Sequence, residues 1–451
     1  MAMGVAQGQE ATLQVAMVCL DELVAEGCRY RKLDRLVDWS FVREAASPYY
    51  ADEVGRPSID PIVLVKLMVA AALEGIGSTR ELCRTAGLRL DLRRFLGYGF
   101  HERLPAHQTL SHAQTRRFVD GALFERLFLR SLDLCKQHGL VEGTHLSVDG
   151  FHAEANAALV SLRASLALVA VEEPGLEEPG EGEPPGLSAP PQLTLAEPRS
   201  GPTPRRRSSN QTSISRTDPE AKLRGKPGQR PHLVYRGQVA VDPKARCVVA
   251  CLGEQADGYE GDALAPILDR ARFACPELDS VGADSGFAAE RVWRGLDKRG
   301  ITAYVPPQPT MLPKDGEPRS EAQREALAAR RRCKSERGVW AHKQRMGDAE
   351  GVIGELKNRH GLGPVRSRGT PLFHVQLLLG CTALNCKRLA DHVPETARGV
   401  AAAPQAAPSD LGPAAAGTPA AARRTPSPAG HAPARADGAS ASTWTYTICL
   451  N

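Results

Sequence analysis

The sequence lacks any apolar run long enough to cross a membrane. A spanning helix needs about 20 consecutive apolar residues, and no segment of the 451-residue chain supplies them. The amino terminus also lacks a basic region followed by an apolar core and a small-residue cleavage site, the pattern of a secretory signal. We therefore expect a soluble, cytoplasmic protein with no membrane partner.

Cysteine pairs of the kind that bind zinc are also missing. The eleven cysteines are scattered, and the close pairs are Cys247 with Cys251 and Cys381 with Cys386. Neither pair has the C-x2-C spacing, with a second pair further along, that zinc sites show. This spacing argues against a zinc-finger architecture and predicts reduced cysteines that bind no metal.

The net charge is small, but positive charge is concentrated in two places. The formal net charge is +5 and the isoelectric point is about 8.6. Eight lysines and arginines lie between Arg205 and Arg230, and another eight lie between Arg324 and Arg345. Such dense basic stretches favour a polyanion as partner, although solvated loops produce them about as often.

Residues from about 10 to 135 show the three- and four-residue apolar spacing of helices. The strongest candidate is the segment DPIVLVKLMVAAALEGIG, with Pro61 at the first helical position. Ser78 and Glu81 then have capping-box spacing, so a second helix should start there. The two helices are compatible with a helix-turn-helix in which Arg80 and Arg84 contact DNA, but a plain helical hairpin is the more common explanation.

The pattern changes near residue 145, where short segments rich in β-branched residues follow one another. Five segments are predicted strands: HLSVD (145–149), HLVYRGQVAVD (232–242), RCVVACLG (246–253), LDSVGADSG (278–286) and ITAYVPP (301–307). The helical candidates DALAPILDRARF and AAERVWRGLDKRG lie between the last three. Strands followed by alternating strands and helices predict a mixed α/β sheet.

Two segments have compositions that cannot bury enough apolar surface to fold. Residues from about 165 to 212 are first acidic, then Pro-rich, then basic, and we interpret them as a disordered insertion between the first two strands. The Ala/Pro-rich stretch 393–451 is predicted to be a disordered tail. The boundaries that follow are a helical domain over 1–140 and a sheet domain over 141–392.

Two of the predicted strands end on a carboxylate with a glycine close behind it. Asp149 follows the alternating run HLSV, and Asp284 follows SVGA. An Asp-Gly turn would explain Asp149 taken alone. The repetition at Asp284 favours a shared site at the strand ends.

A third carboxylate, Glu350, lies in the helical segment WAHKQRMGDAEGVIGELKNRHG. Glu350 and Lys357 are seven residues apart, so at about 100° per residue they lie on one helix face. Three carboxylates packed together would repel one another without a cation, and their oxygens suit Mg²⁺. Two such ions about 4 Å apart promote phosphodiester cleavage by activating the attacking oxygen and stabilising the leaving oxygen.

A second acidic group follows the third predicted strand. It consists of Asp257, Glu260 and Asp262. Asp262 has the position of an N-cap for the next helix, so we interpret this group as lying outside the metal site. Glu355 lies about 140° around the helix from Glu350 and is expected to miss the metals.

The ordered set Asp149, Asp284 and Glu350 resembles the DDE transposases of bacterial insertion sequences. It is most similar to the group numbered eleven-eighty-two, related to group five, whose Arg-x4-Glu-x6-Lys signature is matched by Arg345, Glu350 and Lys357. Further matches are DGFHAEANA after the first aspartate, SRTDPEAK at 215–222 and the segment YRKLDRLVDWSFVREAASPYYADEVGRPSIDPIVLVKLMV. The resemblance extends from about residue 28 to about residue 390, apart from the insertion.

This resemblance implies an RNase H-like, integrase-type catalytic core preceded by an all-α DNA-binding region. It implies that the three carboxylates are catalytic and hold two Mg²⁺ ions, for which Mn²⁺ can substitute. It implies that Lys357 and Arg345 contact DNA phosphate near the cut end. We also expect Arg359 on the same helix, and Arg80 and Arg84 in the helical region, to contact DNA.

The implied activity is metal-dependent DNA cleavage at the ends of a transposable element, followed by strand transfer. The partners would be terminal inverted repeats and target DNA, bound by a homodimer or higher oligomer in the bacterial cytoplasm at the nucleoid. Two alternatives stay open: an RNase H-like nuclease without strand transfer, and an inactive DNA-binding copy that acts as a regulator.

Overall fold

The computed structural model describes residues 18–50, 58–164, 210, 213–225, 230–314 and 316–394. The predicted insertion at 165–212 and the predicted tail at 393–451 lie almost wholly outside these residues, so both stay predictions. Within the described ranges, no single helix combines the length and the apolarity of a membrane span.

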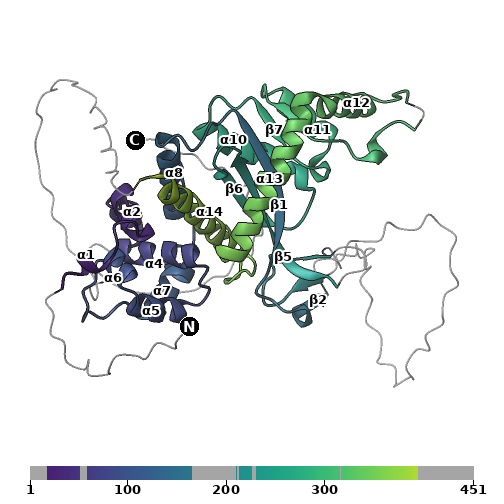
Figure 1. Cartoon of the computed structure of the whole chain (residues 1–451). Coiled ribbons are helices and arrows are strands. Elements are labelled where there is room, and N and C mark those ends of the chain that lie inside the picture. The colour runs from purple at the N-terminus through teal and green to yellow at the C-terminus, as the bar shows by residue number, and fades with distance from the viewer. Residues whose placement is uncertain are drawn as a thin grey trace, which may run out of the picture. The chain divides into compact units, whose positions relative to one another are not determined.

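The described chain before residue 145 is built from helices (Figure 1). The α-helices are α1 Leu20–Leu23, α2 Arg29–Leu36, α3 Phe41–Ala46, α4 Pro61–Glu74, α5 Thr79–Leu88, α6 Leu90–Leu96, α7 His107–His112 and α8 Ala122–Gln137. Helix α4 is the strongest helix that the sequence predicts, and nine of its fourteen residues are buried. Because it is apolar on nearly all sides, it forms the centre of this helical part.

The ends of α4 and α5 follow from local hydrogen bonds. The Asp60 side chain accepts a hydrogen bond from the Ile62 N–H, and α4 ends at Gly75 with a φ of 68°, a value that favours glycine. The Ser78 hydroxyl accepts from the Glu81 N–H at 3.3 Å. The predicted capping box at the start of α5 is therefore confirmed on its Ser78 side.

A six-stranded mixed sheet follows the helices. Its strands are β1 His145–Glu154, β4 Lys222–Arg224, β5 His232–Asp242, β6 Cys247–Gln255, β7 Ser280–Gly282 and β8 Thr302–Tyr304. Strand β5 pairs antiparallel with β1, β4 and β6, whereas β7 runs parallel to both β1 and β8. The prediction of a mixed α/β sheet is confirmed, with β1 between its antiparallel and parallel halves.

Three short strands were not predicted. Besides β4, the strands β2 (Leu162–Ala164) and β3 (Ser213–Ser215) form a separate antiparallel pair. They adjoin the two ends of the predicted insertion. Three-residue strands leave too little alternation in the sequence to reveal them.

Alternate side chains of β1 enter two different hydrophobic cores. The helices that cover the sheet are α10 Leu264–Ala274, α11 Glu290–Asp297, α12 Glu321–Lys334, α13 Glu336–Arg359 and α14 Thr370–His392. Phe151 belongs to the core with α13 and α14, whereas Val148 belongs to the core with α10 and α11. Asp149 has the same parity as Phe151, so its side chain lies on the α13 face.

The core on the α13 face also contains buried residues of the helices α2 to α8. Helix α14 contacts both α4 and α8 as well as β6. Side chains from both sides of the predicted boundary at 140/141 therefore share one core, and the division into two domains there stays a prediction.

Helix α13 lies along β1 and runs in the same direction (Figure 1). Near its start, the Trp340 ring lies 4.7 Å from the His145 ring at the beginning of β1. Near its end, the Lys357 ammonium lies 5.2 Å from the centre of the Phe151 ring. The residues between them, including Glu350, therefore pass the middle of β1.

The prediction that Asp262 caps the following helix is wrong. A 3-10 turn, Glu260–Ala263, precedes α10, and the N-cap of α10 is Ala263 without any side-chain cap. Asp262 lies inside that turn and forms an ion pair with Arg291 at 2.7 Å. The extra turn moves the start of the helix past the residue that the pattern favours.

Gly237 provides a test of the packing beneath the α13 face. It lies opposite Phe151, and a Cβ added to Gly237 would lie 2.7 Å from the ring Cζ. Because the ring is rigid, Gly237→Ala should lower the free energy of unfolding by about 1–3 kcal/mol, measured by urea denaturation. The control is Gly295→Ala in α11, whose Cβ would meet only Arg299 Nη1 at 3.8 Å. A Gly237→Ala variant as stable as the wild type would contradict this packing.

Candidate active site

Two aspartates meet because of the register between β1 and β7. Ser147 of β1 pairs with Gly282 of β7 in a parallel ladder. Asp149 lies two residues beyond Ser147, and Asp284 lies two residues beyond Gly282. The backbone therefore carries both aspartates to the same end of the parallel pair, as the sequence predicts.

The prediction that the strand stops at Asp149 is wrong. Strand β1 continues to Glu154, and Asp149 pairs with Val239 in its middle. No Asp-Gly turn forms, because the residues after Asp149 keep the in-and-out alternation of a strand. Asp284 does follow the end of its strand, where its Oδ1 accepts a hydrogen bond from the Gly286 N–H at 2.9 Å.

Arg345 joins the third carboxylate to the first. Its Nη1 lies 2.9 Å from Asp149 Oδ2, and its Nη2 lies 3.1 Å from Glu350 Oε1. The side chains of Arg345 and Asp149 are 10% and 14% exposed, whereas that of Glu350 is 53% exposed. One buried guanidinium thus bridges carboxylates that come from β1 and from α13.

The surroundings of Asp149 raise the pKa of its carboxyl group. Burial raises its pKa to about 6, and the negative charges of Asp284 and Glu350 act in the same direction. The hydrogen bond from the Gly150 N–H and the charge of Arg345 oppose that rise. The charges of Asp284 and Glu350 therefore both act on Asp149.

The donor set suits a divalent cation in chemistry and charge. Carboxylate oxygens are the ligands that hard cations such as Mg²⁺ prefer. Among the described residues, however, no three His, Cys, Asp or Glu side chains converge as a metal site. The positive charge between Asp149 and Glu350 is instead the Arg345 guanidinium, which stands in for a cation there.

A fourth carboxylate lies beside the two aspartates. A Cβ added to Gly150 would lie 2.3 Å from Glu260 Oε1, and one added to Gly286 would lie 3.4 Å from Glu260 Oε2. The pKa of Glu260 is raised, first by burial and then by the charge of Asp284. Sequence reasoning assigned Glu260 to the acidic group outside the site, because nothing local shows that two glycines make room for it here.

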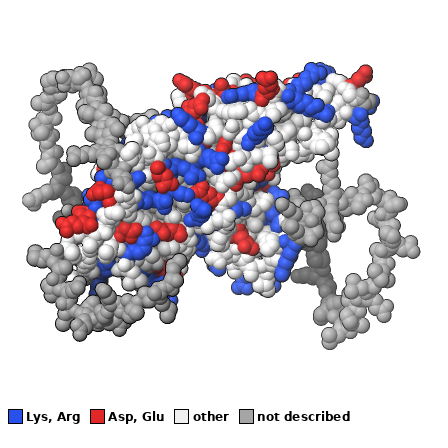
Figure 2. All heavy atoms as spheres, in the orientation of Figure 1, with Lys and Arg blue, Asp and Glu red and all other residues white. Residues whose placement is uncertain are grey.

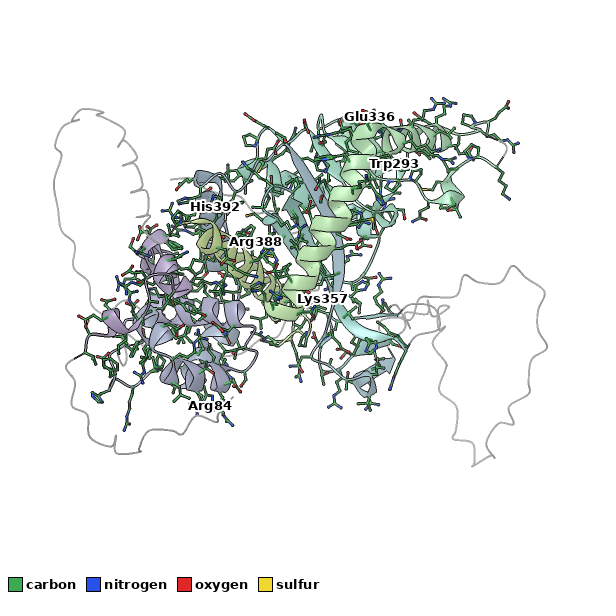
Figure 3. All side chains as sticks on the ribbon, viewed as in Figure 1. Arg84, Trp293, Glu336, Lys357, Arg388 and His392 are labelled. Atoms are coloured by element: carbon green, nitrogen blue, oxygen red, sulfur yellow. The ribbon has the colours of Figure 1, made fainter. Side chains whose placement is uncertain are left out.

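Lys357 supplies a positive charge on this face of β1. Its ammonium lies over Phe151, near the carboxyl-terminal end of α13 (Figure 3), and burial lowers its pKa. Within the described ranges it has no hydrogen-bond or ion-pair partner. Arg359, two residues further along, is exposed, whereas Glu355 forms ion pairs with Lys387 and Arg388 of α14 and so faces away from the triad.

The remaining predicted DNA contacts lie on exposed surfaces. Arg80 and Arg84 are exposed on α5, and Arg84 pairs with Glu81 at 3.0 Å. Figure 2 shows Lys and Arg side chains gathered over α12. The residues of that surface are Arg324, Arg330, Arg331, Arg332 and Lys334.

Two family models match the chain. Residues 18–116 match the family described as "Transposase domain (DUF772)", and residues 202–386 match "Transposase DDE domain". The second span contains Asp284 and Glu350, while Asp149 lies between the two spans. The chain belongs to the DDE transposases of the insertion-sequence type, and it is a metal-dependent DNA transposase.

Comparisons with individual proteins add little to this. No curated protein matches the chain. A cryo-EM structure of the piggyBac transposase synaptic complex with hairpin DNA is 9% identical, with 80% of this chain and 74% of that chain covered and a TM-score of 0.36. A Mos1 transposase paired-end complex with left transposon end is 11% identical, with 75% of this chain and 82% of that chain covered and a TM-score of 0.17.

The raised pKa of Asp149 predicts a pH dependence of stability without metal. The folded chain binds this proton more tightly than the unfolded chain, whose value is the ordinary 3.8. The stabilisation is therefore complete below about pH 4 and is lost as the pH rises through about 6. We expect a loss on the order of 2–3 kcal/mol over that window, by urea denaturation in EDTA.

Asp149→Asn isolates this contribution, because the other titrating groups are common to both proteins. The difference in unfolding free energy between wild type and variant should change between pH 4 and pH 6. A difference that stays constant across this range would show that Asp149 titrates normally.

Proposed function

We propose that this transposase uses Mg²⁺ to cut DNA at the 3′ ends of its element and then joins the freed 3′-hydroxyls to target DNA. The observation that carries the proposal is the triad, with two aspartates fixed by the β1/β7 register and Glu350 tied to Asp149 through Arg345. Asp149, Asp284 and Glu350 would hold two ions. When bound, such ions activate the attacking oxygen and stabilise the leaving one.

We assign the sheet to the RNase H-like, integrase-type class. Its strand order β6-β5-β1-β7-β8 supports this, with three antiparallel strands followed by two parallel to β1. The first carboxylate lies on the central strand, the second follows β7, and the third lies on a later helix. This is the order that the resemblance to DDE transposases implies.

The phosphate-binding role belongs to Lys357. An unpaired, half-buried ammonium is a strong partner for a phosphate oxygen, because it loses no existing ion pair on binding. Phe151, over which it lies, is two residues from Asp149 on the same face of β1. A phosphate beside the carboxylates is therefore within the reach of this side chain, with Arg359 and the basic surface of α12 holding more distant phosphates.

End recognition falls to the helical region, with Arg80 and Arg84 as its DNA contacts. Joining two element ends to one target requires a homodimer or higher oligomer on DNA, working at the nucleoid in the cytoplasm. The finer assignment to group eleven-eighty-two is supported by the spacing of Arg345, Glu350 and Lys357.

Asp284→Asn tests the catalytic triad. Losing a metal ligand removes several kcal/mol of transition-state stabilisation, so cleavage of the flanking element ends should fall by at least about 10³-fold. Strand transfer from pre-cleaved ends should be lost equally, while DNA binding by fluorescence anisotropy stays within about twofold. The control, Asp279→Asn, makes the same change at an exposed position just before β7. If the wild-type protein cleaves element ends but gives no strand-transfer product, it is a nuclease without strand-transfer activity.

Lys357→Ala tests the phosphate contact. Loss of one phosphate contact should weaken binding of the element end and reduce the slope of log K against log salt by about one. The control, Lys244→Ala, removes an exposed charge beyond the far end of β5. Equal salt slopes for the two variants would place Lys357 away from DNA.

A further inference from the structure

We infer that Arg345 is a positioning residue, the resident counter-ion that orients Glu350 toward Asp149 in the metal-free enzyme, and that a divalent cation must take its place. This inference rests on the proposed function, because it concerns how the same carboxylates accept metal. It differs from the DNA contact that the sequence signature suggests for Arg345.

The geometry of the bridge supports this role for Arg345. The two terminal nitrogens of one guanidinium reach two carboxylates, at 2.9 Å from Asp149 and 3.1 Å from Glu350. The planar fork of an arginine suits this bridge, because it presents two nitrogens at a fixed separation, whereas a lysine must reach both carboxylates from a single nitrogen. The Arg345–Asp149 half of the bridge is buried and so is shielded from water and from salt, whereas the Glu350 carboxylate is half exposed.

The position of the Glu350 side chain depends on this bridge. Arg345 and Glu350 are five residues apart, which places them about 140° apart around α13. Glu350 is half exposed, and among the described residues its one ion pair is with Arg345. Without the guanidinium, nothing in this part of the chain would direct Glu350 toward the aspartates.

Negative charge around Arg345 exceeds the positive charge that it supplies. Asp149, Asp284, Glu260 and Glu350 lie around this point, and Arg345 is the cation that pairs with two of them. The Arg345 Nε is also buried without a hydrogen-bond partner. The guanidinium is therefore held by charge and is incompletely satisfied, and a divalent ion with two charges would compensate the carboxylates better.

The consequence is an exchange of cations. In the absence of metal, Arg345 keeps the carboxylates together. When metal occupies the site, the guanidinium is displaced and becomes available to a DNA phosphate, which is the contact that the signature implies. Arg345 thus opposes metal binding while preserving the geometry that metal needs.

Arg345→Gln tests this exchange on the full chain, with Mn²⁺ as the probe. The variant should melt about 5 °C below wild type in EDTA, because two carboxylates lose their counter-ion. It should bind Mn²⁺ about tenfold more tightly by electron paramagnetic resonance, because no internal cation competes. Saturating Mn²⁺ should then raise its melting temperature by more than it raises that of the wild type.

Two further variants complete the experiment. Lys343→Gln removes one exposed charge from the same helix and should change neither the melting temperature in EDTA nor Mn²⁺ affinity. Arg345→Lys keeps the charge but loses the two-nitrogen fork, so it should bridge less well and lie between wild type and Arg345→Gln in both measurements. It also takes the place of Arg345→Gln if that variant does not fold.

Three outcomes separate the claims. Tighter Mn²⁺ binding by the variant, with a Mn²⁺-dependent recovery of stability, supports the counter-ion role. Equal Mn²⁺ affinity in wild type and variant overturns that role and leaves the proposed function standing. Absence of Mn²⁺ binding by both proteins overturns the proposed metal site together with this inference.

Discussion

The candidate active site depends on holding like charges together inside a folded protein. Carboxylates in a partly buried site repel one another and resist ionisation, as the raised pKa of Asp149 shows. The backbone register of β1 and β7 brings Asp149 and Asp284 to the same end of the parallel pair. The third carboxylate is held differently, by a side chain, because Glu350 reaches Asp149 only through Arg345.

The two-sided sheet explains why one helix supplies so much of the chemistry. Asp149 lies on the α13 face, and α13 runs along β1, so that Arg345, Glu350 and Lys357 reach that strand from a single rigid element. Helix α13 continues unbroken through Gly351 and Gly354, which are poor helix formers. Packing of Val352 and Leu356 into the core provides the stability that these glycines do not. Glu350 and Lys357 are therefore held in a fixed relation to each other by one helix.

Local sequence patterns were enough to predict the elements that position the site. The caps of α4 and α5, the start of β1 and the strand before Asp284 all follow from residues within a few positions of one another. The family resemblance then identifies Asp149, Asp284 and Glu350 as the catalytic carboxylates, a role that stays a prediction. The length of β1 was mispredicted because the Asp-Gly pair resembles a turn, and the register with β5 overrides that local preference.

The contacts that could not be predicted join residues far apart in the chain. Arg345 and Asp149 are separated by 196 positions, and no spacing rule links them. Glu260 enters the site because Gly150 and Gly286 leave room for its carboxylate, a fit that exists only after folding. The spacing of Arg345, Glu350 and Lys357 indicated function, whereas the burial of Arg345 between carboxylates required the structure.

The most direct measurement is anomalous diffraction from crystals of the full chain soaked in Mn²⁺. We expect a manganese peak between the carboxylates of Asp149 and Asp284, with Glu350 as a further ligand and the Arg345 guanidinium moved away from Asp149. A peak at the exposed acidic side chains of Asp257 and Asp262, with the Arg345 bridge intact, would contradict this expectation.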